Sequence, residues 1–157
     1  VMTDHITNAV IQTANLNGLA NDELAIAITG SLLHRIGSID AYSFVNCMPK
    51  QTKRGILLGV NSLTFNKLSK VLQKAKKEAT EKEKTFDQNV VLKVLHMCLS
   101  YDSTNVKPCT KEAIILFTTE KSHMAYIESQ EFIDNDRNVD EEFTAFDSTK
   151  GRRYYRG

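Results

Sequence analysis

Apolar residues recur with helical spacing through the stretch LTFNKLSKVLQKAKKEATEKEK, residues 63–84. The residues on its predicted inner face are Phe65, Leu68, Val71, Leu72, Ala75 and Ala79. At about 100° per residue, this i, i+3, i+4, i+7 pattern predicts an amphipathic helix. The opposite face collects the lysines Lys67, Lys70, Lys74 and Lys77. We therefore expect one helix with an apolar inner side and a row of lysines outside.

The same periodicity predicts helices elsewhere in the first two thirds of the chain. Residues 4–15 form a short helix, and residues 22–36 are apolar nearly all round, which is typical of a central buried helix. Ser38 begins a further short helix over residues 39–48, and we favour a helix over residues 50–60. A capping box of Thr85 and Gln88 begins a core helix over residues 85–101. Five to six helices with short links predict a compact helical bundle within residues 1–107.

The pattern changes after Pro108. The segment AIILFTTEKSHMAYIE has β-rich runs on either side of a polar TTEKSH, which favours a hairpin. Alternatively, EAIILF begins a helix capped by Thr110. The segment EEFTAFDSTKGRRYY predicts a second hairpin that turns at residues 148–151. We therefore expect a mainly α fold with a small β-hairpin-containing C-terminal section, residues 108–157, in a single domain over residues 1–157.

Composition is ordinary for a soluble globular protein, with 41% hydrophobic and 25% charged residues among 157. No apolar run approaches the roughly 18 residues that a membrane span needs, so we expect no membrane partner. The three cysteines, Cys47, Cys98 and Cys109, form no C-x-x-C pair. We interpret them as reduced thiols of a cytoplasmic protein, with a Cys98–Cys109 disulfide as the alternative.

Charge is strongly segregated although the net charge is only +1. Residues 50–84 hold ten cationic side chains and three glutamates, whereas residues 120–147 hold nine carboxylates and two cations. The last ten residues add four more cations. Segregation of this kind builds local potential and indicates a charged partner.

Two basic segments are the candidate binding sites for nucleic acid. The first places Lys50, Lys53, Arg54, Lys67, Lys70, Lys74 and Lys77 where they could contact phosphates. The second is the tail with Arg152, Arg153, Tyr154, Tyr155 and Arg156, in which arginines grip phosphate and tyrosines stack on bases. The alternative for the first segment is a solvated helix face. For the tail the alternatives are a strand, a frayed terminus, or pairing with the acidic loop of the same chain.

The motifs of catalysis and metal binding are weak. The stretch Asp134–Asp140 is similar to the first half of an EF-hand loop, but Val139 replaces the turn glycine and Ala145 replaces the bidentate glutamate. The four histidines lack zinc-site spacing, and neither G-x-G nor G-K-[ST] occurs. A nucleophilic Cys98 paired with His34 or His123 has no glycine-rich elbow beside it. We predict no cofactor, no metal and no enzymatic activity.

The stretch DELAIAITGSLLHRIGSI, residues 22–39, resembles a core helix of the pneumovirus transcription processivity factor, a helical RNA-binding module. The resemblance covers this one helix, and the zinc-binding cysteines of that family have no counterpart here. We therefore carry no function over from it.

These patterns predict a non-enzymatic protein that binds RNA or another single-stranded nucleic acid. The alternative hypothesis is a protein–protein adaptor or self-assembling subunit. In that case residues 50–84 of one copy meet residues 120–147 of another, and the homo-oligomer is a ring or a filament.

Overall fold

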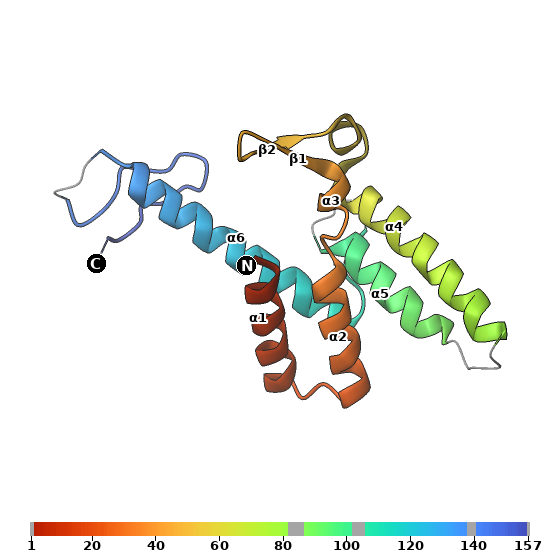
Figure 1. Cartoon of the computed structure of the whole chain (residues 1–157). Coiled ribbons are helices and arrows are strands. Elements are labelled where there is room, and N and C mark those ends of the chain that lie inside the picture. The colour runs from red at the N-terminus through yellow and green to blue at the C-terminus, as the bar shows by residue number, and fades with distance from the viewer. Residues whose placement is uncertain (1, 82–86, 102–105, 138–140, 157) are drawn as a thin grey trace. The chain divides into compact units, whose positions relative to one another are not determined.

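The computed structural model describes residues 2–81, 87–101, 106–137 and 141–156, and it is mainly helical, as predicted (Figure 1). The helices are α1 (Met2–Leu16), α2 (Asn21–Leu33), α3 (Ser38–Ala41), α4 (Lys53–Glu81), α5 (Gln88–Ser100) and α6 (Lys111–Asn135). Strands β1 (Tyr42–Val45) and β2 (Met48–Gln51) lie between α3 and α4. The chain divides into two compact units, Val1–Glu120 and Lys121–Gly157. The single-domain organisation stays a prediction.

The first unit is a bundle in which α1 packs on α2, α2 on α5, and α5 on α4. Its core includes Val10 of α1, Ala27 of α2, Met97 of α5 and Leu116 of α6, all without measurable exposure. The helices α2 and α5 approach closely at Gly30, where an added Cβ would lie 2.5 Å from the Met97 side chain. Helix α2 therefore packs between α1 and α5, as its apolar sequence predicted, although it is not buried on all sides, since Leu32 is 50% exposed.

The hairpin predicted over residues 113–128 is wrong, because these residues belong to the helix α6. The buried positions Ala113, Leu116 and Glu120 follow helical spacing, which alternating β-type burial does not produce. Thr110 caps the helix, since its hydroxyl accepts a hydrogen bond from the Ala113 N–H at 3.3 Å. The alternative helix capped by Thr110 is therefore the structure that forms.

The β-hairpin lies at residues 42–51, where we expected helix. The predicted helix over residues 39–48 ends at Ala41, and β1 begins at the next residue. The two strands are antiparallel and are joined by Asn46 and Cys47, whose φ angles are 52° and 62°. Two successive positive φ angles form the tight turn whose twist suits a hairpin. Because neither residue is glycine, the sequence carried no strong signal for this turn.

Helix α4 begins later than expected and is kinked. Lys50 lies in β2, so the helix predicted over residues 50–60 begins only at Lys53. Gly59 interrupts α4 with φ 71° and ψ 163°, a conformation that is essentially confined to glycine. The segment 60–81 then runs as the long amphipathic helix (Figure 1).

Helix α5 is capped by Asp87, whose side chain accepts a hydrogen bond from the Asn89 N–H at 2.8 Å. Thr85 of the predicted capping box lies outside the described residues.

The second unit contains the C-terminal part of α6 and the segment after it. The predicted second hairpin is only partly present, as two isolated antiparallel bridges that join Phe143 to Tyr155 and Asp147 to Arg152. The turn over residues 148–151 is present, but the described part of this segment contains no strand. The Asp147 carboxylate holds this turn, since its Oδ1 accepts a hydrogen bond from the Thr149 N–H at 2.9 Å.

Candidate nucleic-acid interface

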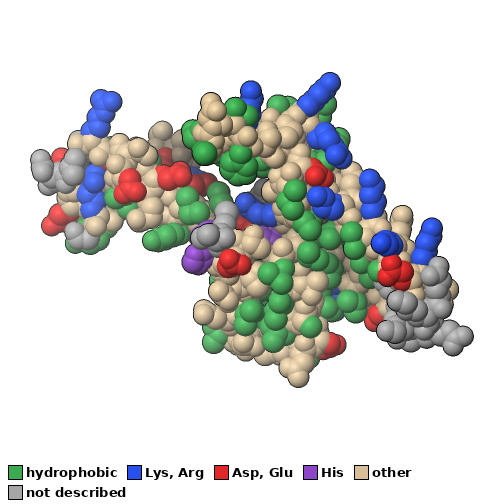
Figure 2. Space-filling model, viewed as in Figure 1, with side chains coloured by type: hydrophobic (Ala, Val, Ile, Leu, Met, Phe, Trp, Pro, Cys, Tyr) green, Lys and Arg blue, Asp and Glu red, His purple; other side chains and the backbone are tan. Residues whose placement is uncertain are grey.

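The row of lysines on α4 is largely exposed to solvent. Lys70, Lys74 and Lys77 are exposed, and Figure 2 shows cationic side chains spaced along this helix. Lys74 lies 3.9 Å from Glu78 of the same helix, and its side chain is 80% exposed, so this pair restrains the lysine little. These three ammonium groups are therefore accessible to a partner.

Lys67 differs from the other lysines of the row because it takes part in the fold. Its Nζ lies 3.2 Å from Oδ1 of Asp40 in α3, and its side chain is 29% exposed. The inner face of α4 is also rotated from the predicted one. Leu63 and Leu68 are buried, whereas Phe65 and Val71 are 38% and 60% exposed. This rotation brings Lys67 to the edge of the packed face.

The remaining predicted cations of this segment lie at the start of α4 and in β2. Lys50, Lys53 and Arg54 are all exposed. The backbone there is anchored by Thr52, whose N–H donates to the Ala41 carbonyl at 2.9 Å. The structure thus places exposed cations both before and after the kink at Gly59.

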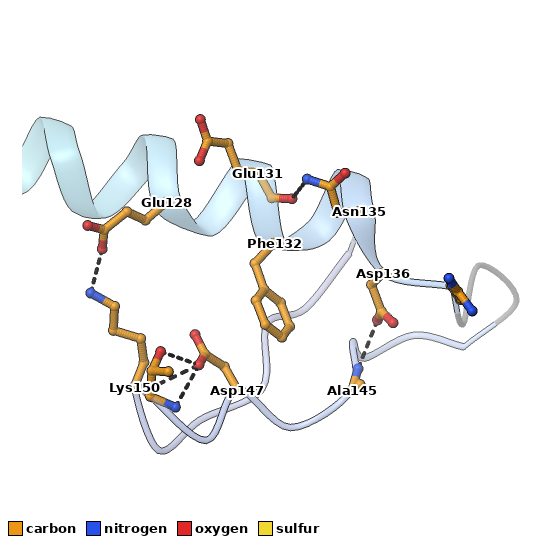
Figure 3. A pocket seen from close by; sticks show the side chains of 10 residues that line it. Glu128, Glu131, Phe132, Asn135, Asp136, Ala145, Asp147 and Lys150 are labelled. Carbon is orange, nitrogen blue, oxygen red and sulfur yellow. Dashed lines mark hydrogen bonds and ion pairs between the residues drawn. The ribbon is translucent and has the colours of Figure 1, made fainter. Parts of the chain in front are cut away.

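The basic tail is partly neutralised inside the second unit. The Arg156 guanidinium lies 2.7 Å from Oδ2 of Asp136, and both side chains are largely buried, at 14% and 6% exposure. Lys150 lies 2.5 Å from Glu128, and this hydrogen bond raises the pKa of Lys150 above its usual value. Lys150 lines a cavity of about 680 Å³ (Figure 3). Asp136 also lines this cavity, and its carboxylate accepts a hydrogen bond from the Ala145 N–H. The tail therefore pairs with acidic residues of its own chain.

The tyrosines of the tail differ in their availability. Tyr154 is half-buried, with its ring centroid 5.6 Å from that of Phe132 and the Arg152 guanidinium 5.2 Å above it. Tyr155 is 60% exposed beside Phe143, at 5.3 Å between ring centroids. Arg152 and Arg153 are exposed. Of the predicted tail residues, Arg152, Arg153 and Tyr155 can reach a partner without a change in the fold.

Comparisons with protein-family models, with curated proteins and with solved structures found no match.

A buried cluster that the sequence did not predict joins the residues just after α2, His34 and Arg35, to Glu120 of α6. Nε2 of His34 lies 2.5 Å from Oε1 of Glu120, and both side chains are nearly inaccessible, at 0% and 3% exposure. Nε of Arg35 lies 3.3 Å from the same carboxylate oxygen. Burial raises the pKa of Glu120, but the His34 hydrogen bond and the Arg35 charge outweigh burial and lower it overall. Because 86 residues separate His34 from Glu120, no local pattern pointed to the pair.

The structure pairs a different cysteine and histidine from those considered in the sequence. Sγ of Cys109 lies 3.3 Å from Nε2 of His96, and the Cys109 N–H donates to the same nitrogen at 3.0 Å. Cys98 is instead fully buried, and burial raises the pKa of its thiol to about 12. The three cysteines are all free thiols.

The described part of the chain holds no group of three or more histidine, cysteine, aspartate or glutamate side chains arranged to bind a metal ion. Asn138, Val139 and Asp140 of the EF-hand-like stretch lie outside it. Among the same residues, no helix is both long enough and apolar enough to cross a bilayer.

Proposed function

We propose that this protein binds single-stranded nucleic acid, RNA included, without catalysis, through the exposed cations of α4. The observation that carries the proposal is the exposure of Lys70, Lys74 and Lys77 on one side of a long helix. Before the kink, Lys53 and Arg54 of α4 and the neighbouring Lys50 of β2 extend the set, and we name these six residues the α4 basic surface. Lys67 is left out because its ammonium group pairs with Asp40.

The dimensions of the α4 basic surface suit a phosphate backbone. At 1.5 Å of rise per residue, Lys70 and Lys77 are about 10 Å apart along the helix axis. Lysine ammonium groups act as flexible point charges, so they contact phosphates without reading the base sequence. The expected binding is therefore strong at low salt and shows little sequence preference.

The test is the salt dependence of binding to a fluorescent single-stranded oligonucleotide. Each phosphate contact to a single strand contributes about −0.7 to the slope of log K against log salt. Changing Lys70, Lys74 and Lys77 to Ala should therefore make the slope shallower by about 2 and weaken binding at low salt. The triple variant should remain folded, because all three side chains are exposed.

The matched control removes the same charge elsewhere, by changing the exposed Lys107, Lys111 and Lys121 to Ala. We expect this variant to keep most of the slope of the unaltered protein. If both variants reduce the slope equally, the effect comes from net charge, and the α4 basic surface is not the binding site.

The opposite charges also support a second candidate function, which is electrostatic self-assembly between residues 50–84 and residues 120–147. Glu131, Asp134, Glu141 and Glu142 are exposed and could meet the basic segment of another copy. Light scattering on the nucleic-acid-free protein separates the two functions. A mass that falls as salt rises supports self-assembly, because salt screens exposed charges.

A further inference from the structure

The hairpin of β1 and β2 is exposed at every residue. It extends from the end of α3, away from α1, α2 and α5 (Figure 1). A two-stranded hairpin is marginal in water and usually needs a further strand or a packed face. Because every residue of the hairpin is exposed, no further strand or packed face from the described residues supplies this stabilisation.

The two edges of this hairpin differ in how they are protected. Val45 and Met48 flank the two-residue turn and form a hydrogen-bonded pair, so the Phe44–Pro49 pair is a non-hydrogen-bonded one. The N–H and C=O of Phe44 therefore point away from β2. On the outer edge of β2, Pro49 offers no N–H and Lys50 adds a charge, and both features discourage the addition of a strand. Strand β1, with the sequence YSFV, has neither a proline nor a charge.

Many of the large apolar side chains in and around the hairpin are exposed. Within residues 39–58 the exposed large apolar side chains are Ile39, Tyr42, Phe44, Val45, Met48, Ile56, Leu57 and Leu58. Phe44 is 77% exposed and Met48 is 69% exposed. Because side chains alternate along a strand, Tyr42 and Phe44 lie on one face of β1 and Val45 lies on the other, so both faces of β1 carry exposed apolar side chains.

We propose that β1 pairs antiparallel with β1 of a second copy, which joins the two hairpins into one four-stranded sheet. A twofold axis then lies at Phe44, whose N–H and C=O bond reciprocally with those of the other Phe44. A second copy fits better than a charged partner because β1 is uncharged and aromatic, and aromatic side chains across neighbouring strands stabilise a sheet. Lys50 lies on the far edge of each hairpin, so the pairing brings no like charges together at the axis.

The first experiment measures the mass of the full chain by light scattering at high salt, where contacts between exposed charges are screened. We expect a mass near twice the 17.7 kDa of one chain. Phe44→Lys should weaken dimerisation by about tenfold or more, because it places two ammonium groups at the axis. The matched control, Gln51→Lys, adds the same charge to the outer strand β2 and should leave the dimer intact.

A second measurement tests the position of the axis by cross-linking. Phe44→Cys is made in a background in which the exposed Cys47 and Cys109 are changed to Ser. Directly opposed residues of a hydrogen-bonded pair have Cα atoms about 5.5 Å apart, which suits a disulfide. We expect oxidised dimers for Phe44→Cys and none for Gln51→Cys in the same background.

Three results overturn the proposal. The first is a monomer at high concentration and high salt, which would leave β1 to some other partner. The second is equal mass for the Phe44→Lys and Gln51→Lys variants. The third is equal cross-linking by the two cysteine variants. Circular dichroism of each variant checks that the helices are retained, so that a loss of dimer is not caused by unfolding.

Discussion

The buried cluster of His34, Arg35 and Glu120 offers the sharpest test of what holds the first unit together. Glu120 is 2% exposed, and its carboxylate lies against Nε2 of His34 and Nε of Arg35, so Glu120→Ala removes the anionic member of this cluster. Breaking a buried ion pair by removing one partner typically costs about 3–5 kcal/mol. With a urea m-value of about 2 kcal/mol per M, the midpoint of unfolding should fall by roughly 1.5–2.5 M.

The assay is urea unfolding at neutral pH, followed by circular dichroism, with two companion variants. Glu120→Gln retains the shape and one hydrogen bond, so it should cost less, about 1–3 kcal/mol. Glu128→Ala removes a carboxylate whose side chain is 43% exposed and paired with Lys150, and it should cost about 1 kcal/mol or less. If Glu120→Ala costs no more than Glu128→Ala, the cluster does not stabilise the fold and our reasoning is refuted.

The same cluster makes a prediction about pH. The pKa of Glu120 is lower in the folded chain than its ordinary value. A carboxyl group with a lowered folded pKa contributes stability above its unfolded pKa and loses that contribution as pH falls through the folded pKa. The difference in unfolding free energy between the unaltered protein and Glu120→Gln should therefore shrink as the solution is acidified below the usual carboxyl range.

Two further predictions test local features of the fold. Gly59→Ala should lower the unfolding free energy by about 1–3 kcal/mol, because φ is 71° at this position. No atom lies within 4 Å of an added Cβ, so the cost comes from backbone strain and not from a clash. Urea unfolding measures this cost, and an unchanged midpoint would contradict the positive φ at Gly59. In the folded protein the exposed Cys47 and Cys109 should react with a thiol reagent, whereas Cys98 should react only after unfolding, since it is buried and its thiol pKa is raised to about 12. Three equally fast thiols would contradict the packing of α5.

Much of the helical framework could be predicted because its signal is local. The apolar spacing in α1 and α5 reflects which side of each helix faces the core, and a few turns of sequence are enough to reveal it. The same reasoning failed for α6, whose β-branched and aromatic residues resemble strand sequence. There, burial of Ala113 and Leu116 against the bundle outweighed the local preference for strand. The hairpin was missed because its turn uses Asn46 and Cys47 without a glycine.

The candidate site shows the same division between local and long-range information. The sequence by itself determined that α4 is amphipathic and that its outer side carries lysines, because both properties follow from the helical repeat. Only the tertiary structure decided which of those lysines stay accessible, since α3 brings Asp40 to Lys67 while leaving Lys70 exposed. In the same way, the tertiary structure pairs Arg156 with Asp136 and His34 with Glu120. Such pairs form only where two distant segments of the chain pack together. The local sequence around each residue contains no pattern from which this packing could be predicted.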